Sequence, residues 1–125
     1  FMAKYNGWAL QSEYASRNTS HQPALMQDTF DNELLIPTGY GLNSQVSYVF
    51  PSMVELAFRH TLVRSEKETW PYPGDRDVYT VGCTRYFRNH RNKLQVNLSY
   101  NNALEPLNGV SSSHWQTMVQ IELGI

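Results

Sequence analysis

Apolar and polar residues alternate without interruption over residues 115–125. The apolar positions are Trp115, Thr117, Val119, Ile121, Leu123 and Ile125, and the positions between them are Gln116, Met118, Gln120, Glu122 and Gly124. Because successive side chains of a strand point to opposite faces, this run predicts a strand with one apolar and one mostly polar face. The closing strand of a transmembrane β-barrel has this pattern, with one face in lipid and the other in a wet lumen.

The same period of two recurs in earlier segments of the chain. They are a stub at 1–5 and runs at 8–17, 39–50, 53–63, 78–87 and 93–101. Asn6-Gly7 between the first two is a strong signal for a two-residue hairpin turn, because both positions tolerate a positive φ. No segment has the period of a helix. We therefore predict an all-β fold, an antiparallel transmembrane β-barrel of which this chain supplies about seven strands.

The connections between these strands alternate in length. Those after the second, fourth and sixth strands are long, at about 18–38, 64–77 and 102–113, and the others are short. Outer-membrane barrels have short periplasmic turns and longer extracellular loops. The alternation predicts a bacterial outer-membrane location, with the C-terminus on the periplasmic side.

The pattern assigns side chains to the two sides of the barrel wall. The lipid-facing candidates are Trp8, Leu10, Leu42, Val46, Leu56, Phe58, Val81, Leu94, Val96, Leu98, Val119, Ile121 and Leu123. The charged candidates for the lumen are Glu13, Arg17, Glu55, Arg59, Lys93 and Glu122. Three are acidic and three are basic, so they do not form the ladder of one sign that a selective ion path requires. An ordinary polar lining with local ion pairs is favoured over direct contact of Arg17, Arg59 or Lys93 with a solute.

The charged and aromatic content agrees with a barrel more than with an ordinary soluble domain. The chain has 125 residues, enough for one domain, and only 17% are charged, below the quarter or so that is usual for soluble domains. Aromatic residues reach 13%, which suits the girdles of a barrel. The net charge of -1 and the absence of a basic run do not indicate nucleic-acid binding. No apolar run approaches the roughly 18 residues of a membrane helix. The chain opens at Phe1 within the alternating pattern, so we expect it to be the C-terminal portion of a single larger barrel domain spanning 1–125 here.

The sequence contains no recognisable catalytic or metal-binding motif. The histidines lack ligand spacing, and Cys83 occupies an outward position, where it acts as a small hydrophobe. The acidic residues of the second long loop do not match a known Ca²⁺-binding loop and are interpreted as solvated. We expect a protein that is not an enzyme and that needs no cofactor or metal.

Several blocks resemble the phosphate-selective porin O and P family, especially its Bacteroidetes members. They are residues 4–14 (KYNGWALQSEY), 39–50 (GYGLNSQVSYVF), 55–59 (ELAFR), 79–90 (YTVGCTRYFRNH) and 93–100 (KLQVNLSY). The resemblance covers nearly all predicted strands and almost none of the long loops. It implies a barrel of sixteen strands, commonly trimeric, that passes small anions, with the remainder of the wall supplied from outside these strands. Two positions depart from the pattern: Arg85 replaces an outward aromatic residue, and Ile125 replaces a final Phe or Trp.

Three functions remain open from the sequence. The first is a porin that lets small polar or anionic solutes diffuse through a polar lumen, with the lipid bilayer, the remainder of the barrel, and either a homotrimer or other outer-membrane subunits as partners. The second is a structural barrel subunit of a larger outer-membrane complex, which serves secretion, assembly or uptake. The third is a soluble β-sandwich binding module in which the outward faces form a core.

Overall fold

The computed structural model describes residues 1–18, 25–27, 33–35, 38–65, 74–87, 92–104 and 111–124, and within these residues every regular element is a strand. The strands are β1 (Met2–Tyr5), β2 (Trp8–Arg17), β3 (Leu25–Gln27), β4 (Glu33–Leu35), β5 (Gly39–Val49), β6 (Val54–Ser65), β7 (Arg76–Phe87), β8 (Asn92–Leu104) and β9 (Ser111–Leu123). No described helix has the length and apolar character to cross a membrane.

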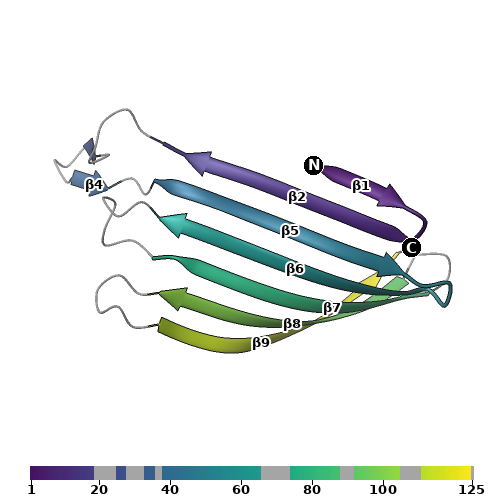
Figure 1. Cartoon of the computed structure of the whole chain (residues 1–125). Coiled ribbons are helices and arrows are strands. Elements are labelled where there is room, and N and C mark those ends of the chain that lie inside the picture. Colours follow the sequence, from purple (N-terminus) through teal and green to yellow (C-terminus); the bar gives the residue numbers. More distant parts are fainter. Residues whose placement is uncertain are drawn as a thin grey trace.

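Seven of these strands form one open antiparallel sheet in the order β1-β2-β5-β6-β7-β8-β9 (Figure 1). Apart from the β3–β4 insertion, each strand pairs with the next one along the chain, so the sheet is a simple meander. This confirms the predicted all-β fold with seven antiparallel strands. The order has a further consequence for direction: β1 and β9, at the two edges, both run toward the end of the sheet that carries the short turns.

The predicted loop boundaries at 64–77 and 102–113 are wrong. β6 continues to Ser65, β7 begins at Arg76, β8 continues to Leu104, and β9 begins at Ser111. The apolar pattern ends earlier than the strands because backbone hydrogen bonds continue the ladder where side chains on both faces are polar. The predicted loop at 18–38 also contains the β3–β4 hairpin, whose three-residue strands are too short to show a period.

Two short turns have the backbone conformation that a hairpin of right-handed twist requires. Asn6 and Gly7 have φ of 46° and 85°, the two positive values of a type I′ turn, which confirms the predicted hairpin. A Cβ at Gly7 would lie 3.0 Å from the carbonyl oxygen of Val49, and the Val49 amide donates to the Gly7 carbonyl oxygen at 2.9 Å. The β5–β6 turn places Met53 at φ 61° and is closed by its amide, which donates to the Phe50 carbonyl oxygen at 2.9 Å.

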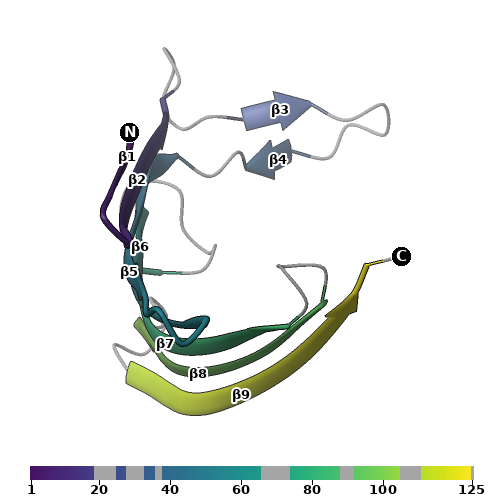
Figure 2. The ribbon, with the colours of Figure 1, turned by 90° about the vertical axis from the view of Figure 1, so that its right-hand side faces the viewer.

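The sheet bends into an open trough, seen along the strands in Figure 2. β1, β2, β5 and β6 form one side, and β7, β8 and β9 curve away below them to form the other. The β3–β4 hairpin lies beyond the end of the sheet that carries the long connections and projects toward the open side of the trough (Figures 1 and 2). The shape places one surface of the sheet on the convex outside and the other inside the trough.

The two surfaces have opposite chemistry. The apolar face is defined by one row of paired residues: Leu10, Val46, Phe58, Val81 and Leu98. The polar face is defined by the adjacent row: Gln11, Gln45, Arg59, Thr80 and Ser99. The polar face is concave, and side chains crowd there: Ser47 and Asn101 are 4% exposed and Thr84 is 8% exposed.

The apolar face is uncovered. Phe58 and Leu98 are each 45% exposed, and on β9 Ile121 is 68% exposed. None of the described large side chains is fully buried, so this sheet has no core of its own. An uncovered apolar surface of this extent is unusual on a soluble monomer, and in other proteins such surfaces commonly contact a partner or lipid.

Candidate functional site

The register brings the predicted lipid-facing residues onto one surface. Trp8, Tyr48, Leu56, Cys83, Val96 and Val119 form a row across the sheet that is parallel to the Leu10–Leu98 row. Leu42 on β5, and Leu94, Ile121 and Leu123 near the short-turn end, lie on the same face by alternation. Val96 is 41% exposed and Val119 is 61% exposed, so neither side chain is packed in a protein core.

Aromatic rings gather at two levels of the apolar face. At the long-connection end, Tyr14 and Tyr40 lie 6.2 Å apart between ring centroids, and Tyr100 and Trp115 lie 5.0 Å apart. At the short-turn end, Tyr48 contacts both Trp8, at 4.9 Å, and Phe50, at 4.8 Å. These spacings are those of favourable tilted and edge-to-face pairs, and such rings with polar tips suit the two boundaries of an apolar band.

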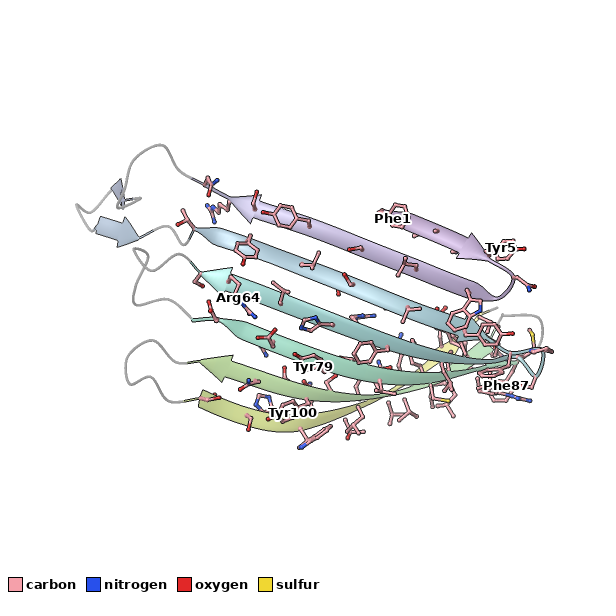
Figure 3. The ribbon with its side chains drawn as sticks, viewed as in Figure 1. Phe1, Tyr5, Arg64, Tyr79, Phe87 and Tyr100 are labelled. Carbon is pink, nitrogen blue, oxygen red and sulfur yellow. The ribbon has the colours of Figure 1, made fainter. Side chains whose placement is uncertain are left out.

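An ionic cluster, made of His60, Arg64, Asp75 and Asp77, lies at the aromatic level of the long-connection end, where His60 pairs with Tyr79 and Arg64 pairs with Tyr40. Arg64 Nη2 donates to both oxygens of Asp77, at 3.1 and 2.8 Å, and Arg64 Nε lies 3.8 Å from Asp75 Oδ2. His60 Nε2 lies 3.1 Å from Asp77 Oδ1, and the His60 ring stacks on Tyr79 with centroids 4.6 Å apart. Figure 3 shows Arg64 near the end of β6 and Tyr79 on the neighbouring β7. The cluster ties β6 to β7 where the apolar pattern stops.

The interpretation of this segment as a loop hid the cluster. Alternation from His60 through Leu62 to Arg64 is the signal that places these residues on one face. It is weak because polar residues occupy two of the three positions. Polar ends on the apolar face limit the apolar band to the rows between the two aromatic levels.

The six charged residues predicted for the lumen all lie on the polar face, but they do not form one site. Lys93 Nζ and Glu122 Oε2 form an ion pair at 2.8 Å between β8 and β9. Glu55 Oε2 accepts a hydrogen bond from the Tyr86 hydroxyl. Arg59 Nε donates to Gln45 Oε1 at 2.9 Å. The structure therefore separates these residues into local pairs and brings only Glu55 and Arg59 to the same place.

Glu13 and Arg17 lie apart from these pairs, on β2 toward the long-connection end. Arg17 lines a hollow of about 500 Å³ at that end, together with Gly39, Gly41, Val63 and Arg76. Arg76 Nη2 donates to Asn101 Oδ1 at 3.0 Å. Arg76 was missed as a lumen candidate because the second long loop was predicted to include it.

Uncharged hydrogen bonds join the strands along the polar face. Thr61 Oγ1 donates to Asn43 Oδ1 at 2.9 Å, and the Thr80 and Ser99 hydroxyls are 2.8 Å apart. Cross-strand pairs of this kind hold a polar sheet surface in register without a packed core. The interior of the trough is therefore ordered as well as polar.

The middle of the polar face carries a hollow of about 200 Å³, which we call the central hollow. Its floor is low because Ala57 and Gly82 face each other on β6 and β7. Its rim carries Gln45, Glu55, Arg59, Gln95 and Asn97. A Cβ at Gly82 would lie only 2.6 Å from Asn97 Oδ1, so the glycine is what leaves room for that amide.

Two outward positions noted in the sequence have distinct surroundings. Cys83 is a free thiol and is exposed on the apolar face. Arg85 lies on the same face at the short-turn end, where its Nη1 donates to the Ser52 carbonyl oxygen at 2.7 Å. The guanidinium is thus satisfied by the turn of the neighbouring hairpin and reaches away from the apolar band, as the snorkelling of long cationic side chains predicts.

Within the described part of the chain, no group of three or more His, Cys, Asp or Glu residues is arranged to hold a metal ion. The arrangement described above can offer hydrogen bonds and local charges to a solute, and an apolar surface to lipid.

Comparison of the chain with protein-family models, with curated proteins and with solved structures gave no match.

Proposed function

We propose that this chain forms part of the wall of a bacterial outer-membrane β-barrel of porin type, through which small polar or anionic solutes diffuse passively. The observation that carries the proposal is the pairing of a continuous, uncovered apolar face with an ordered polar face on the same curved sheet. A barrel wall needs both surfaces, because one side contacts hydrocarbon and the other contacts water.

The height of the apolar face fits a bilayer. On β9 the apolar positions run from Trp115 to Leu123, eight residue steps that span about 27 Å along the strand. With a strand tilt of about 40°, this is about 20 Å along the membrane normal, close to the roughly 25 Å apolar band of such barrels. The aromatic pairs at both limits would then lie at the levels of the lipid headgroups.

The direction of the edge strands constrains what completes the wall. β1 and β9 run in the same direction, so a strand that pairs antiparallel with β9 is also antiparallel to β1. An all-antiparallel cylinder therefore requires an odd number of further strands between β9 and β1. The remainder of the barrel predicted by the family resemblance satisfies this rule, since a wall of sixteen strands would add nine to these seven.

Passage through such a lumen would be filtered by size and local charge. Lys93 and Glu122 neutralise each other, and Glu55 is engaged by Tyr86. Arg17, Arg59 and Arg76 remain directed along the polar face together with Glu13. This distribution offers attraction to anions at separate places and no continuous ladder of charge.

Quenching of tryptophan fluorescence by lipids with brominated acyl chains tests the membrane assignment. The protein is reconstituted in vesicles with Trp70→Phe, which leaves Trp8 and Trp115 on the apolar face. We expect strong quenching of both. In a variant lacking both of these residues, a reporter introduced by Gln116→Trp on the polar face should be quenched much less.

The alternatives give different results. A soluble β-sandwich would stay in buffer without detergent, and its tryptophans would not be quenched by lipid. A structural subunit of a larger complex would be quenched by lipid and would co-purify with other subunits in fixed ratio, but vesicles that contain it would show little permeability. Solute-dependent swelling of vesicles together with lipid quenching is the result expected for a porin.

A further inference from the structure

The central hollow has a pattern of hydrogen-bonding groups that differs from an ion site. We propose that it binds a neutral polyhydroxyl solute, such as a mono- or disaccharide, and that this class of solute is a permeant of the pore. The second half of this inference rests on the proposed porin function, whereas the first half concerns the hollow alone.

The formal charge of the hollow is balanced. Arg59 and Glu55 are the only charged residues that line it. They lie four residues apart on β6 and therefore on the same face. An anion site would present donors alone, and a cation site would present acceptors alone. Neither describes a rim with one cation, one anion and three side-chain amides.

The groups on the rim retain unused hydrogen-bonding capacity of both kinds. Arg59 Nε donates to Gln45 Oε1, so the two Nη groups of the guanidinium can donate to another partner. Gln95 Nε2 donates to Asn97 Oδ1 at 3.1 Å, which leaves the Gln95 oxygen as an acceptor and the Asn97 nitrogen as a donor. Among the described residues, no other hydrogen bond engages these atoms.

A sugar hydroxyl matches this mixture because it donates one hydrogen bond and accepts others. Neighbouring hydroxyls on a ring therefore need donors and acceptors side by side, as Asn97, Gln95 and Arg59 supply them. The groups are held in place by the Gln95–Asn97 and Arg59–Gln45 contacts, so less conformational entropy is lost on binding.

The floor of the hollow contributes shape. Ala57 and Gly82 lie directly opposite each other and keep the floor low, and Thr80, Thr84 and Tyr86 complete the lining. Because a methyl group at position 82 would meet Asn97 Oδ1 at 2.6 Å, Gly82→Ala should both fill the floor and displace an amide of the rim.

NMR titration of the protein, isotopically labelled and reconstituted in detergent or lipid nanodiscs, tests the site. Glucose, sucrose and inorganic phosphate are the probes. We expect saturable shifts of the side-chain amide resonances of Gln45, Gln95 and Asn97 with the sugars, and no competition from phosphate. Phosphate shifting these resonances in place of the sugars, or no saturable shift with either sugar, would overturn the proposal.

Variants separate binding from folding. Gln95→Leu removes one donor–acceptor group and should weaken sugar binding about tenfold. Gln116→Leu makes the same change on the polar face of β9, outside the hollow, and should leave binding unchanged. Gly82→Ala should abolish binding. If it does not fold, Gln95→Leu and Arg59→Met still decide the question, because equal binding by these variants and the unmodified protein would contradict the site.

Vesicle swelling in the same sugars keeps the two proposals apart. Saturable sugar binding without vesicle swelling would support the binding site and contradict the pore. Vesicle swelling without saturable sugar binding would support the pore and contradict the binding site. If both proposals are correct, vesicles that contain the unmodified protein should swell in the sugars. In Gln95→Leu, the swelling rate and the sugar affinity should both fall.

Discussion

Arg64 Nη2 lies 3.1 Å from one carboxylate oxygen of Asp77 and 2.8 Å from the other, and this contact joins β6 to β7 at their ends. Both side chains are more than two-thirds buried, with 29% and 23% of their surfaces exposed. Charge-assisted hydrogen bonds shielded in this way contribute more than surface pairs do.

We expect Arg64→Ala to lower the free energy of unfolding by about 1–2 kcal/mol, because Asp77 would lose the guanidinium that donates to both of its oxygens while remaining shielded. Urea unfolding of the reconstituted protein, followed by circular dichroism, measures the change. The matched control is Lys93→Met: it breaks the Lys93–Glu122 pair, in which Glu122 is 56% exposed, and should cost less than about 1 kcal/mol. Equal effects of the two substitutions would contradict a special role for the ionic cluster.

Leu98→Arg places a charge in the middle of the apolar face. If this face contacts lipid, folding into bilayers should be destabilised by about 2–4 kcal/mol. Gln116→Arg, on the opposite face of the adjacent strand, is the control and should change stability by less than about 1 kcal/mol. A neutral result for Leu98→Arg in lipid would remove Leu98 from the membrane interior.

Gly7→Ala tests the β1–β2 turn. The residue has φ of 85°, and its added Cβ would approach the Val49 carbonyl oxygen to 3.0 Å. We expect a loss of about 1–2 kcal/mol in unfolding free energy. Gly41→Ala provides the comparison, because its Cβ would meet the nearest atom, the Leu62 carbonyl oxygen, at an ordinary 3.5 Å. Equal losses of unfolding free energy in Gly7→Ala and Gly41→Ala would contradict the requirement for glycine in this turn.

Cys83 reports directly on the surroundings of the apolar face. In vesicles, its thiol should react with an uncharged, lipid-soluble maleimide and resist a charged thiol reagent, because it is exposed on that face and lipid would exclude the charged compound. A Cys83→Ser protein that carries Gln116→Cys should show the opposite preference. Mass spectrometry of the labelled protein gives both extents of reaction, and rapid labelling of Cys83 by the charged reagent would place it in water.

The sequence predicted the strands well where side chains alternate. β2 spans Trp8–Arg17 as expected, and the polar and apolar faces of β8 follow from Leu94, Val96 and Leu98 alone. Alternation fixes the face of each residue because a slip of one residue would exchange the faces. It does not fix where a strand ends, which is why Arg64, Arg76 and Asp77 were predicted in a loop.

The contacts within the polar face could not be predicted from alternation. The pattern gives the face of Glu55, Arg59 and Gln95, but the neighbours of each depend on register across four strands. Gly82 illustrates the limit: its meaning comes from the approach of Asn97 on the next strand, fifteen residues further along the chain.

The common direction of β1 and β9 restricts how two copies of this sheet can associate. Two copies with the same strand direction and with their apolar faces on the same side can meet edge to edge only as a parallel pair, β9 against β1. Antiparallel pairing of β9 with a second β9 is possible, but it turns one copy upside down and sends the long connections to opposite sides. If the chain inserts into a membrane from a single side, as proposed, this twofold pairing is disfavoured, and the thirteen-residue edge of β9 is left for a strand of the opposite direction.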